Sequence, residues 1–208
     1  MTLSKRLMDI TISLLLAIIL WPALLVLIVV LAIFEGRPFF YISERMKTPT
    51  QGFSLIKLRT MRASTQNTGV TGGDKSQRMS RLHQLMRKTR ADELPQLYNV
   101  LRGDISLVGP RPPLRAYVDA FPALYERVLQ SRPGVTGLAS LTYHAHEELL
   151  LERCTDAAQT DAVYRRACIP RKARLDLIYQ AKRSLCFDLL LIWQTAKKPF
   201  QRKSQSNY

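Results

Sequence analysis

The chain has 208 residues, of which 47% are hydrophobic and 23% charged, and its formal net charge is +15. This length allows one domain of ordinary size with a real core, in addition to a long apolar segment near the N-terminus. Its three cysteines are odd in number and far apart, which excludes a disulfide scaffold or a clustered zinc site and favours a reducing, cytosolic setting. The positive charge attracts nucleic acid, anionic lipid or phosphorylated substrates without choosing among them.

The apolar segment from Leu14 to Phe34 carries no charge and is long enough to cross a bilayer, which takes about 20 residues. Pro22 lies near its middle and removes a backbone hydrogen bond, so we expect a kink at Trp21-Pro22. Basic residues flank the segment on both sides, and basic flanks prefer the cytoplasm. A spanning helix and a re-entrant helix that enters and returns are both open from these residues.

A β-hairpin is predicted after the apolar segment. Two runs of β-branched and aromatic residues, at 39–42 and 52–59, flank a turn at 48–52. The second run alternates apolar and polar positions and carries Lys57 and Arg59 near its end. The hairpin therefore delivers two basic side chains close to one end of a strand.

Helices are predicted after a polar loop at 64–76, because apolar side chains recur at helical spacing. They are expected at 77–89, 95–102, 114–130, 147–164 and 172–195, with a short extended piece at 105–108. Pro95 suits the first turn of its helix, and Gly103 closes it. Asp92 and Glu93 therefore lie at or just before a helix N-terminus. The last helix has an apolar stripe and basic residues opposite, which fits either the core or the membrane interface.

The pair Asp92-Glu93 is the main candidate for chemistry. Neighbouring side chains on a helix point about 100° apart, so the two carboxylates suit two separate roles. One could attack a phosphorus atom and form an acyl phosphate, if cations or Mg²⁺ offset the repulsion between the anions. The candidate cations are Lys57, Arg59, Arg87, Lys88, Arg90 and Arg111. An Asp-Glu pair at a helix start is also a common cap, and the residues alone favour this alternative over catalysis.

The run DELPQLYNVLRGDISLVGPRP, from Asp92 to Pro112, resembles the signature of the bacterial monotopic phosphoglycosyl transferases. These small enzymes transfer a sugar 1-phosphate to polyprenyl phosphate. Further blocks agree with the family in order along the chain, namely KRLMD at 5–9, KLRTM at 57–61, RPGVTG at 132–137 and Asp188. The resemblance covers nearly the whole chain, and its central motif is long enough to be specific.

The resemblance implies an α/β fold with three parts. Residues 1–36 would form a re-entrant membrane helix kinked at Trp21 and Pro22. Residues 37–200 would form a small, mostly helical catalytic domain with a short hairpin and interfacial amphipathic helices, and residues 201–208 a basic polar tail. The implied location is the bacterial inner membrane, with the catalytic domain on the cytoplasmic face and in contact with membrane lipids.

The reaction implied by the resemblance moves a sugar 1-phosphate from a UDP-sugar to polyprenyl phosphate, with undecaprenyl phosphate as the expected lipid, and releases UMP. It would begin the assembly of a bacterial surface glycan. Asp92 matches the nucleophile that forms a phosphosugar intermediate, and Glu93 the partner of a Mg²⁺ cofactor. Arg87 and Arg111 match phosphate-binding arginines. Lys57 is a basic residue beside the site, and Arg59 is a further phosphate-binding candidate on the same strand end.

The main alternative is a membrane-anchored basic protein that binds anionic lipid or nucleic acid without catalysis. The resemblance predicts no nucleic-acid partner and leaves room for a homo-oligomer. The chain departs from the family in two places. Trp21 stands where the family often has Ser, and the stretch from Leu138 to His146 differs from the usual sequence, which leaves the sugar open.

Overall fold

The computed structural model describes residues 1–61 and 79–201, with side chains described up to residue 197. It mixes helices with two two-stranded sheets, which confirms the α/β class. The elements are, in chain order, α1 (Leu3–Phe34), β1 (Phe40–Met46), β2 (Gly52–Leu58), α2 (Arg81–Thr89), α3 (Gln96–Arg102), β3 (Ser106–Val108), α4 (Arg115–Ala120), α5 (Pro122–Val128), β4 (Gly134–Thr136), α6 (Leu138–Thr142), α7 (His144–Glu152), α8 (Ala157–Val163), α9 (Ile169–Lys182) and α10 (Leu185–Gln201). The loop expected at 64–76 and residues 202–208 lie outside the described residues.

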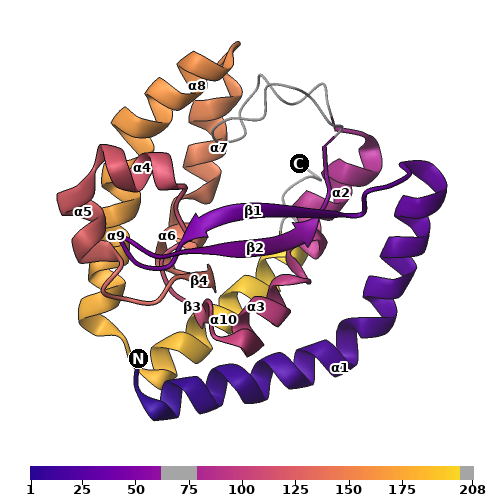
Figure 1. Cartoon of the computed structure of the whole chain (residues 1–208), viewed down its shortest axis with the longest axis horizontal. Coiled ribbons are helices and arrows are strands. Elements are labelled where there is room, and N and C mark those ends of the chain that lie inside the picture. The colour runs from indigo at the N-terminus through magenta and orange to yellow at the C-terminus, as the bar shows by residue number, and fades with distance from the viewer. Residues whose placement is uncertain (62–78, 202–208) are drawn as a thin grey trace.

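The helix α1 is longer than the predicted apolar segment. It begins after Thr2, whose hydroxyl accepts the backbone N–H of Lys5, and it ends before Gly36, which has a positive φ of 70°. Within the described residues it is the one helix that is long and apolar enough to cross a membrane. Pro22 lies inside the helix, and the two halves of α1 run in different directions (Figure 1).

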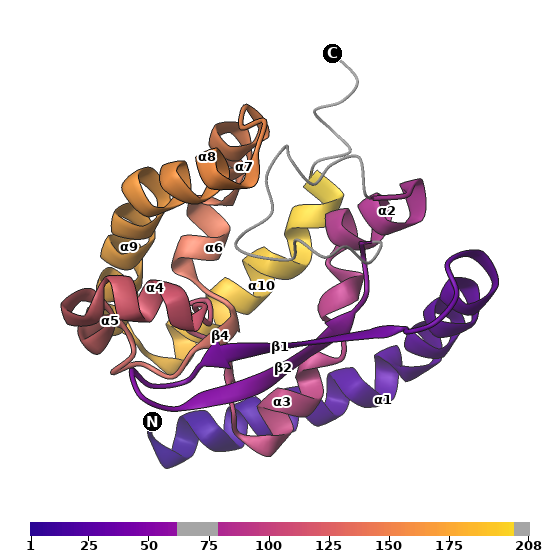
Figure 2. The ribbon, with the colours of Figure 1, turned by 45° about the horizontal axis from the view of Figure 1, so that its top comes forward.

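The hairpin of β1 and β2 is confirmed, with antiparallel pairing that sets Tyr41 opposite Lys57. Figure 2 shows α1 and α3 on one side of it and α4, α6 and α9 on the other. The side chain of Asn99 joins α3 to β2, because it accepts the N–H of Ile56 at 3.1 Å and donates to the carbonyl of Ser54 at 2.9 Å. These two bonds fix the end of β2 that carries Lys57 against the segment around α3.

A second sheet forms from β3 and β4, which pair in parallel with Ser106 opposite Gly134. A Cβ atom on Gly134 would lie 2.2 Å from the backbone nitrogen of Gly109, so this close approach requires glycine. The extended piece at 105–108 is thus confirmed, whereas β4 lies where the sequence predicted only a break between helices. The pairing anchors the segment that leads from β3 to Arg111.

Three helices that the sequence predicts as single are interrupted, so those predictions are wrong in extent: 114–130, 147–164 and 172–195. Pro122 begins α5 directly after the end of α4. Asp156 begins α8, because its carboxylate accepts the N–H of Gln159 at 2.7 Å. Ser184 begins α10, because its hydroxyl accepts the N–H of Phe187 at 3.1 Å.

The predicted helix at 77–89 begins only at Arg81 in the described residues, where the hydroxyl of Ser80 accepts the N–H of His83 at 3.3 Å. The helix after Pro95 is confirmed as α3. Gly103 ends it with a φ of 88°, in the left-handed region that favours glycine.

The apolar stripe predicted for 172–195 divides between two environments. Tyr179 and Leu191 are buried and pack with the side chains of β3. Leu185, Leu189 and Trp193, which belong to α10, are exposed. The stripe therefore contributes to the core and also leaves an apolar face exposed, and placement at the membrane interface stays a prediction.

The N-terminal end of α1 docks on the rest of the protein through charged side chains. Asp9 is fully buried and accepts the hydroxyl of Ser106 at 2.7 Å. Arg6 donates to the last carbonyls of α3 at 2.6 and 2.7 Å. Lys5 forms an ion pair with the buried Asp188 of α10 at 2.6 Å. These contacts hold the start of α1 against α3, β3 and α10.

The C-terminal end of α1 docks on the same body. Leu31 is buried in a cluster with Leu58 of β2 and Met86 of α2. Arg59 donates to the backbone carbonyls of Glu35 and Gly36 at 3.1 and 3.0 Å, just past the helix end. Both ends of the apolar helix therefore contact one folded unit.

Candidate active site

Asp92 and Glu93 lie in a single 3-10 turn (Ala91–Glu93) between α2 and α3. The turn begins after Arg90, which ends α2 in the left-handed conformation with a φ of 59°. The residue that precedes α3 is Pro95, and no side chain caps that helix. The alternative that the Asp-Glu pair serves as a helix cap is therefore not supported, and both carboxylates are left for other contacts.

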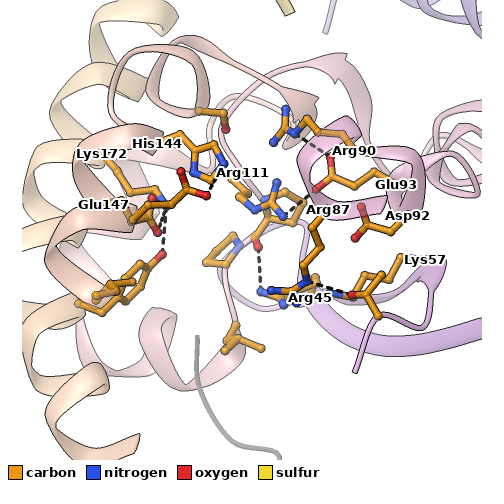
Figure 3. A pocket seen from close by; sticks show the side chains of 18 of the residues that line it. Arg45, Lys57, Arg87, Arg90, Asp92, Glu93, Arg111, His144, Glu147 and Lys172 are labelled. Carbon is orange, nitrogen blue, oxygen red and sulfur yellow. Dashed lines mark hydrogen bonds and ion pairs between the residues drawn. The ribbon is translucent and has the colours of Figure 1, made fainter. Parts of the chain in front are cut away.

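A cavity of about 1050 Å³ opens beside this turn. Side chains from the hairpin, α2, the 3-10 turn, the segment after β3, α7 and α9 line it, and Figure 3 shows how the charged ones face one another. The charged side chains labelled there are Arg45, Lys57, Arg87, Arg90, Asp92, Glu93, Arg111, Glu147 and Lys172. The elements thus bring together residues that lie more than 120 positions apart in the chain, from 45 to 172.

Glu93 is held by two arginines. Its Oε1 accepts a hydrogen bond from Arg111 Nη2 at 2.9 Å, and its Oε2 lies 3.5 Å from Arg90 Nε. Burial raises the pKa of Glu93, but the charges of Arg111 and Arg90 outweigh it and hold this pKa below the usual range. Glu93 is therefore ionised at neutral pH, and it orients the guanidinium of Arg111, whose side chain is still 42% exposed.

Asp92 is only 6% exposed, and no hydrogen bond or ion pair joins its carboxylate to another of the described residues. Burial and the charge of Glu93 raise its pKa, whereas Lys57, Arg87 and Arg111 act against the rise. Figure 3 shows Asp92 on the same side of the cavity as Lys57 and Arg87. A buried carboxylate that has no partner among the described residues and lies close to several cations can react with or bind a ligand in the cavity.

The basic side chains expected at the site differ in what they contact. Burial, with the charges of Arg111 and Arg87, lowers the pKa of Lys57 to about 8, and its amine lies 5.2 Å from the ring centre of Tyr41. Arg87 Nε donates to the hydroxyl of Thr60 at 3.0 Å. Lys57, Arg87 and Arg111 thus surround the carboxylate pair, as the sequence predicts.

Arg59 borders the cavity, but its described hydrogen bonds go to the carbonyls of Glu35 and Gly36. Arg59 lies one residue beyond the end of β2, and its guanidinium reaches back to the end of α1. Its role in phosphate binding remains a prediction, and its observed contact is with the end of α1.

Sequence reasoning missed the wall of the cavity formed by α7 and α9. Lys172 pairs with Glu147 at 2.9 Å and donates to the hydroxyl of Tyr164 at 3.3 Å. His144 also lines this wall, within the stretch where the sequence departs from the family resemblance. Sequence reasoning also missed Arg45 of β1, which was considered only as one of the basic residues that follow the apolar segment. Strand alternation was the available signal, since it puts Arg45 and Lys57 on one face of the hairpin.

A long apolar helix, a carboxylate pair and a cavity rich in basic side chains define a membrane-associated protein whose site suits a phosphorylated ligand. The chain belongs to the bacterial sugar transferase family, whose model matches residues 1–202. Family membership confirms the resemblance found in the sequence.

Several curated proteins are similar to the chain. It is 30% identical over 199 residues, 93% of this chain and 43% of the relative, to the UDP-N-acetylgalactosamine-undecaprenyl-phosphate N-acetylgalactosaminephosphotransferase of Aeromonas hydrophila. It is 36% identical over 143 residues, 67% of this chain and 54% of the relative, to the UDP-glucose:undecaprenyl-phosphate glucose-1-phosphate transferase of Caulobacter vibrioides. It is 33% identical over 150 residues, 64% of this chain and 31% of the relative, to the UDP-galactose-lipid carrier transferase of Erwinia amylovora. The chain thus spans about half the length or less of these relatives.

Proposed function

We propose that the protein transfers a sugar 1-phosphate from a UDP-sugar to polyprenyl phosphate and releases UMP. The observation that carries this proposal is the buried Asp92 carboxylate, which has no partner among the described residues and lies close to Lys57, Arg87 and Arg111. The names of the relatives support the two substrate classes, since they combine a UDP-sugar with undecaprenyl phosphate. They name different sugars, so the sugar taken by this chain is left to experiment.

In the proposed mechanism, an oxygen of Asp92 attacks the phosphorus atom that carries the sugar. The bond from this phosphorus to the UMP oxygen breaks, UMP leaves with the electron pair, and the sugar phosphate stays on Asp92 as an acyl phosphate. An oxygen of polyprenyl phosphate then attacks the same phosphorus and releases the Asp92 carboxylate. The cations Lys57, Arg87 and Arg111 offset the repulsion between carboxylate and phosphate, and their charge acts strongly because the site is largely buried.

The carboxylate pair also fits Mg²⁺, which prefers oxygen ligands and commonly binds one or two carboxylates together with substrate phosphates. Glu93 Oε2 accepts no hydrogen bond from a described residue, and the oxygens of Asp92 have no protein partner there. Glu93 would hold the ion, with Asp92 close by. When bound, Mg²⁺ supplies positive charge to the phosphate oxygens. Glu93 itself keeps Arg111 in place, so it serves the site with or without this role.

We further propose that α1 is re-entrant, with the catalytic domain on the cytoplasmic face of the inner membrane. Support comes from the two ends of α1, since Arg6 and Leu31 both contact the same folded unit, which can lie on only one side of a bilayer. The proposed parts are the membrane helix 1–36, the catalytic domain 37–200 and the basic tail 201–208. Single cysteines at positions 2 and 40, in a chain freed of its own cysteines, should be labelled from the same side. Labelling from opposite sides would rule out re-entry.

The activity is tested with the full chain in lipid nanodiscs, by measuring UMP release from a panel of UDP-sugars with undecaprenyl phosphate and Mg²⁺. Sustained release is expected only when a suitable UDP-sugar and the lipid phosphate are both present. Asp92→Asn should abolish turnover, whereas Asp119→Asn, which alters an exposed carboxylate on α4, should retain it. A correctly folded Asp92→Asn variant with full turnover would show that the covalent mechanism is wrong.

A further inference from the structure

Arg45 is a cavity side chain to which neither the family match nor the proposed mechanism gives a role. It lies on β1, and the register of the hairpin puts it on the same face as Lys57. It borders the cavity with Arg111, and Figure 3 shows its guanidinium among the basic side chains. Its charge therefore acts on Lys57, and the charge of Arg111 acts on it, within the same cavity.

The guanidinium of Arg45 is poorly satisfied by the protein. Its Nη1 donates one long hydrogen bond, of 3.4 Å, to the carbonyl of Pro112. Its Nε is buried and has no hydrogen-bond partner, and none of the ion pairs between described residues includes Arg45. Burial and the charge of Arg111 lower its pKa, yet a guanidinium stays protonated at any physiological pH. A partly buried charge that lacks a counterion among the described residues is costly, so this site favours an anionic ligand.

The carboxylate nearest in sequence is unable to neutralise Arg45. Successive residues of a strand point to opposite faces, so Glu44 is directed away from the cavity. Its carboxylate is exposed and pairs with Arg115 at 2.7 Å. Since no described carboxylate forms an ion pair with Arg45, an anion bound in the cavity can serve as its partner. A planar guanidinium fits two oxygens of a phosphate group, and Arg45 and Arg111 border the same cavity.

We propose that Arg45 binds a phosphoryl group of the substrate within the cavity, as a residue that positions the phosphate beside Arg111 and Lys57. This inference rests on the proposed function for the identity of the substrates. Two sources share the required chemistry, namely the diphosphate of the nucleotide sugar and the phosphate of the lipid. Measurements with each substrate varied separately distinguish these sources.

The test compares Arg45→Gln and Arg45→Lys with the wild type in nanodiscs, and Arg115→Gln is the matched control because it removes an exposed arginine next to the same strand. Loss of a hydrogen-bonded charge should raise KM about tenfold to a hundredfold for the substrate whose phosphate Arg45 binds. A rise for the UDP-sugar assigns the diphosphate, and a rise for the lipid assigns the lipid phosphate. Arg45→Lys should lie in between, since it keeps the charge but loses the planar fork. Arg115→Gln should stay within about twofold of the wild type, as expected for an exposed pair.

A second measurement is independent of turnover. Inorganic pyrophosphate and inorganic phosphate should raise the thermal midpoint of the wild type, and Arg45→Gln should reduce this rise without lowering the midpoint of the unliganded protein to the same degree. A purely structural role, through the carbonyl of Pro112, would lower the midpoint equally with and without the anion. The inference is overturned if Arg45→Gln leaves both KM values and the anion-dependent shift of the midpoint within twofold of the wild type. If Arg45→Gln does not fold, the same criterion applies to Arg45→Lys. Absence of UMP release by the wild type would instead contradict the proposed function, and the anion-dependent shift would still test Arg45.

Discussion

Lys57 should give the activity an alkaline limit. Burial, together with the charges of Arg111 and Arg87, lowers its pKa to about 8, compared with the usual 10.5. With this pKa, about nine-tenths of the amines are protonated at pH 7 and only about one-tenth at pH 9. If the protonated amine is needed to bind the phosphate of the nucleotide sugar, kcat/KM should fall about tenfold between these two pH values. The sign follows from the lysine, since its charge is complete below the pKa and is lost above it.

The assay is the initial rate of UMP release at low UDP-sugar concentration between pH 6 and pH 10. Lys57→Arg keeps its charge over this whole range, so its rate should lose the alkaline decline. Lys57→Met should be slow throughout and should show no decline with a midpoint near pH 8. Lys182→Gln, which alters an exposed lysine at the end of α9, should retain the profile of the wild type. The reasoning is refuted if Lys57→Arg declines with the same midpoint as the wild type, because another group would then set the limit.

Two further substitutions test groups away from the carboxylate pair. Burial raises the pKa of Asp176 to about 7. Between about pH 4 and pH 7 the carboxyl group therefore keeps its proton in the folded state and loses it in the unfolded chain. The free energy of unfolding falls as the pH rises through this window. Asp176→Asn should therefore raise the free energy of unfolding at pH 8 by up to about 4 kcal/mol, which is measured as a higher thermal midpoint, and should leave it nearly unchanged at pH 4. Equal shifts of the midpoint at both pH values would contradict this account. Asp188→Asn should destabilise the protein by roughly 3 kcal/mol in thermal unfolding, because Lys5 loses its partner at 2.6 Å, and an unchanged midpoint would show that the pair contributes little.

The parts of the fold that follow from local signals could be predicted from the sequence. The hairpin follows from its turn, and α3 from Pro95 and Gly103, which mark its start and end through backbone geometry alone. The breaks inside the later helices could not be predicted in the same way. Apolar spacing continues across them, and each new helix begins at a single residue such as Asp156 or Ser184 whose capping bond is visible only in the structure. The parallel pairing of β3 with β4 is a contact between distant segments, which periodicity does not indicate.

At the candidate site, too, some residues could be predicted from the sequence and others could not. The central motif identified Asp92, Glu93 and Arg111, and the structure brings them to one cavity. Strand alternation puts Arg45 on the face of Lys57, but this signal depends on the register of the hairpin, which only the structure establishes. It also could not reveal that Arg59, two residues after Lys57, bonds to the end of α1. The contact of Arg59 depends on where β2 ends and on where the end of α1 lies.

The docking of α1 gives the apolar helix a second role in the proposed reaction. Arg6 bonds to the last carbonyls of α3, the helix that follows the turn bearing Asp92. Asp9 bonds to Ser106 of β3, the strand that leads to Arg111. The helix α1 therefore contacts directly both segments that carry the proposed phosphate-binding residues. Since the depth of an apolar helix is set by the bilayer, the height of the cavity above the lipid is fixed with it. In the proposed reaction, a water-soluble UDP-sugar and a lipid phosphate at the head-group level would then meet Asp92 without a search for the membrane at each turnover.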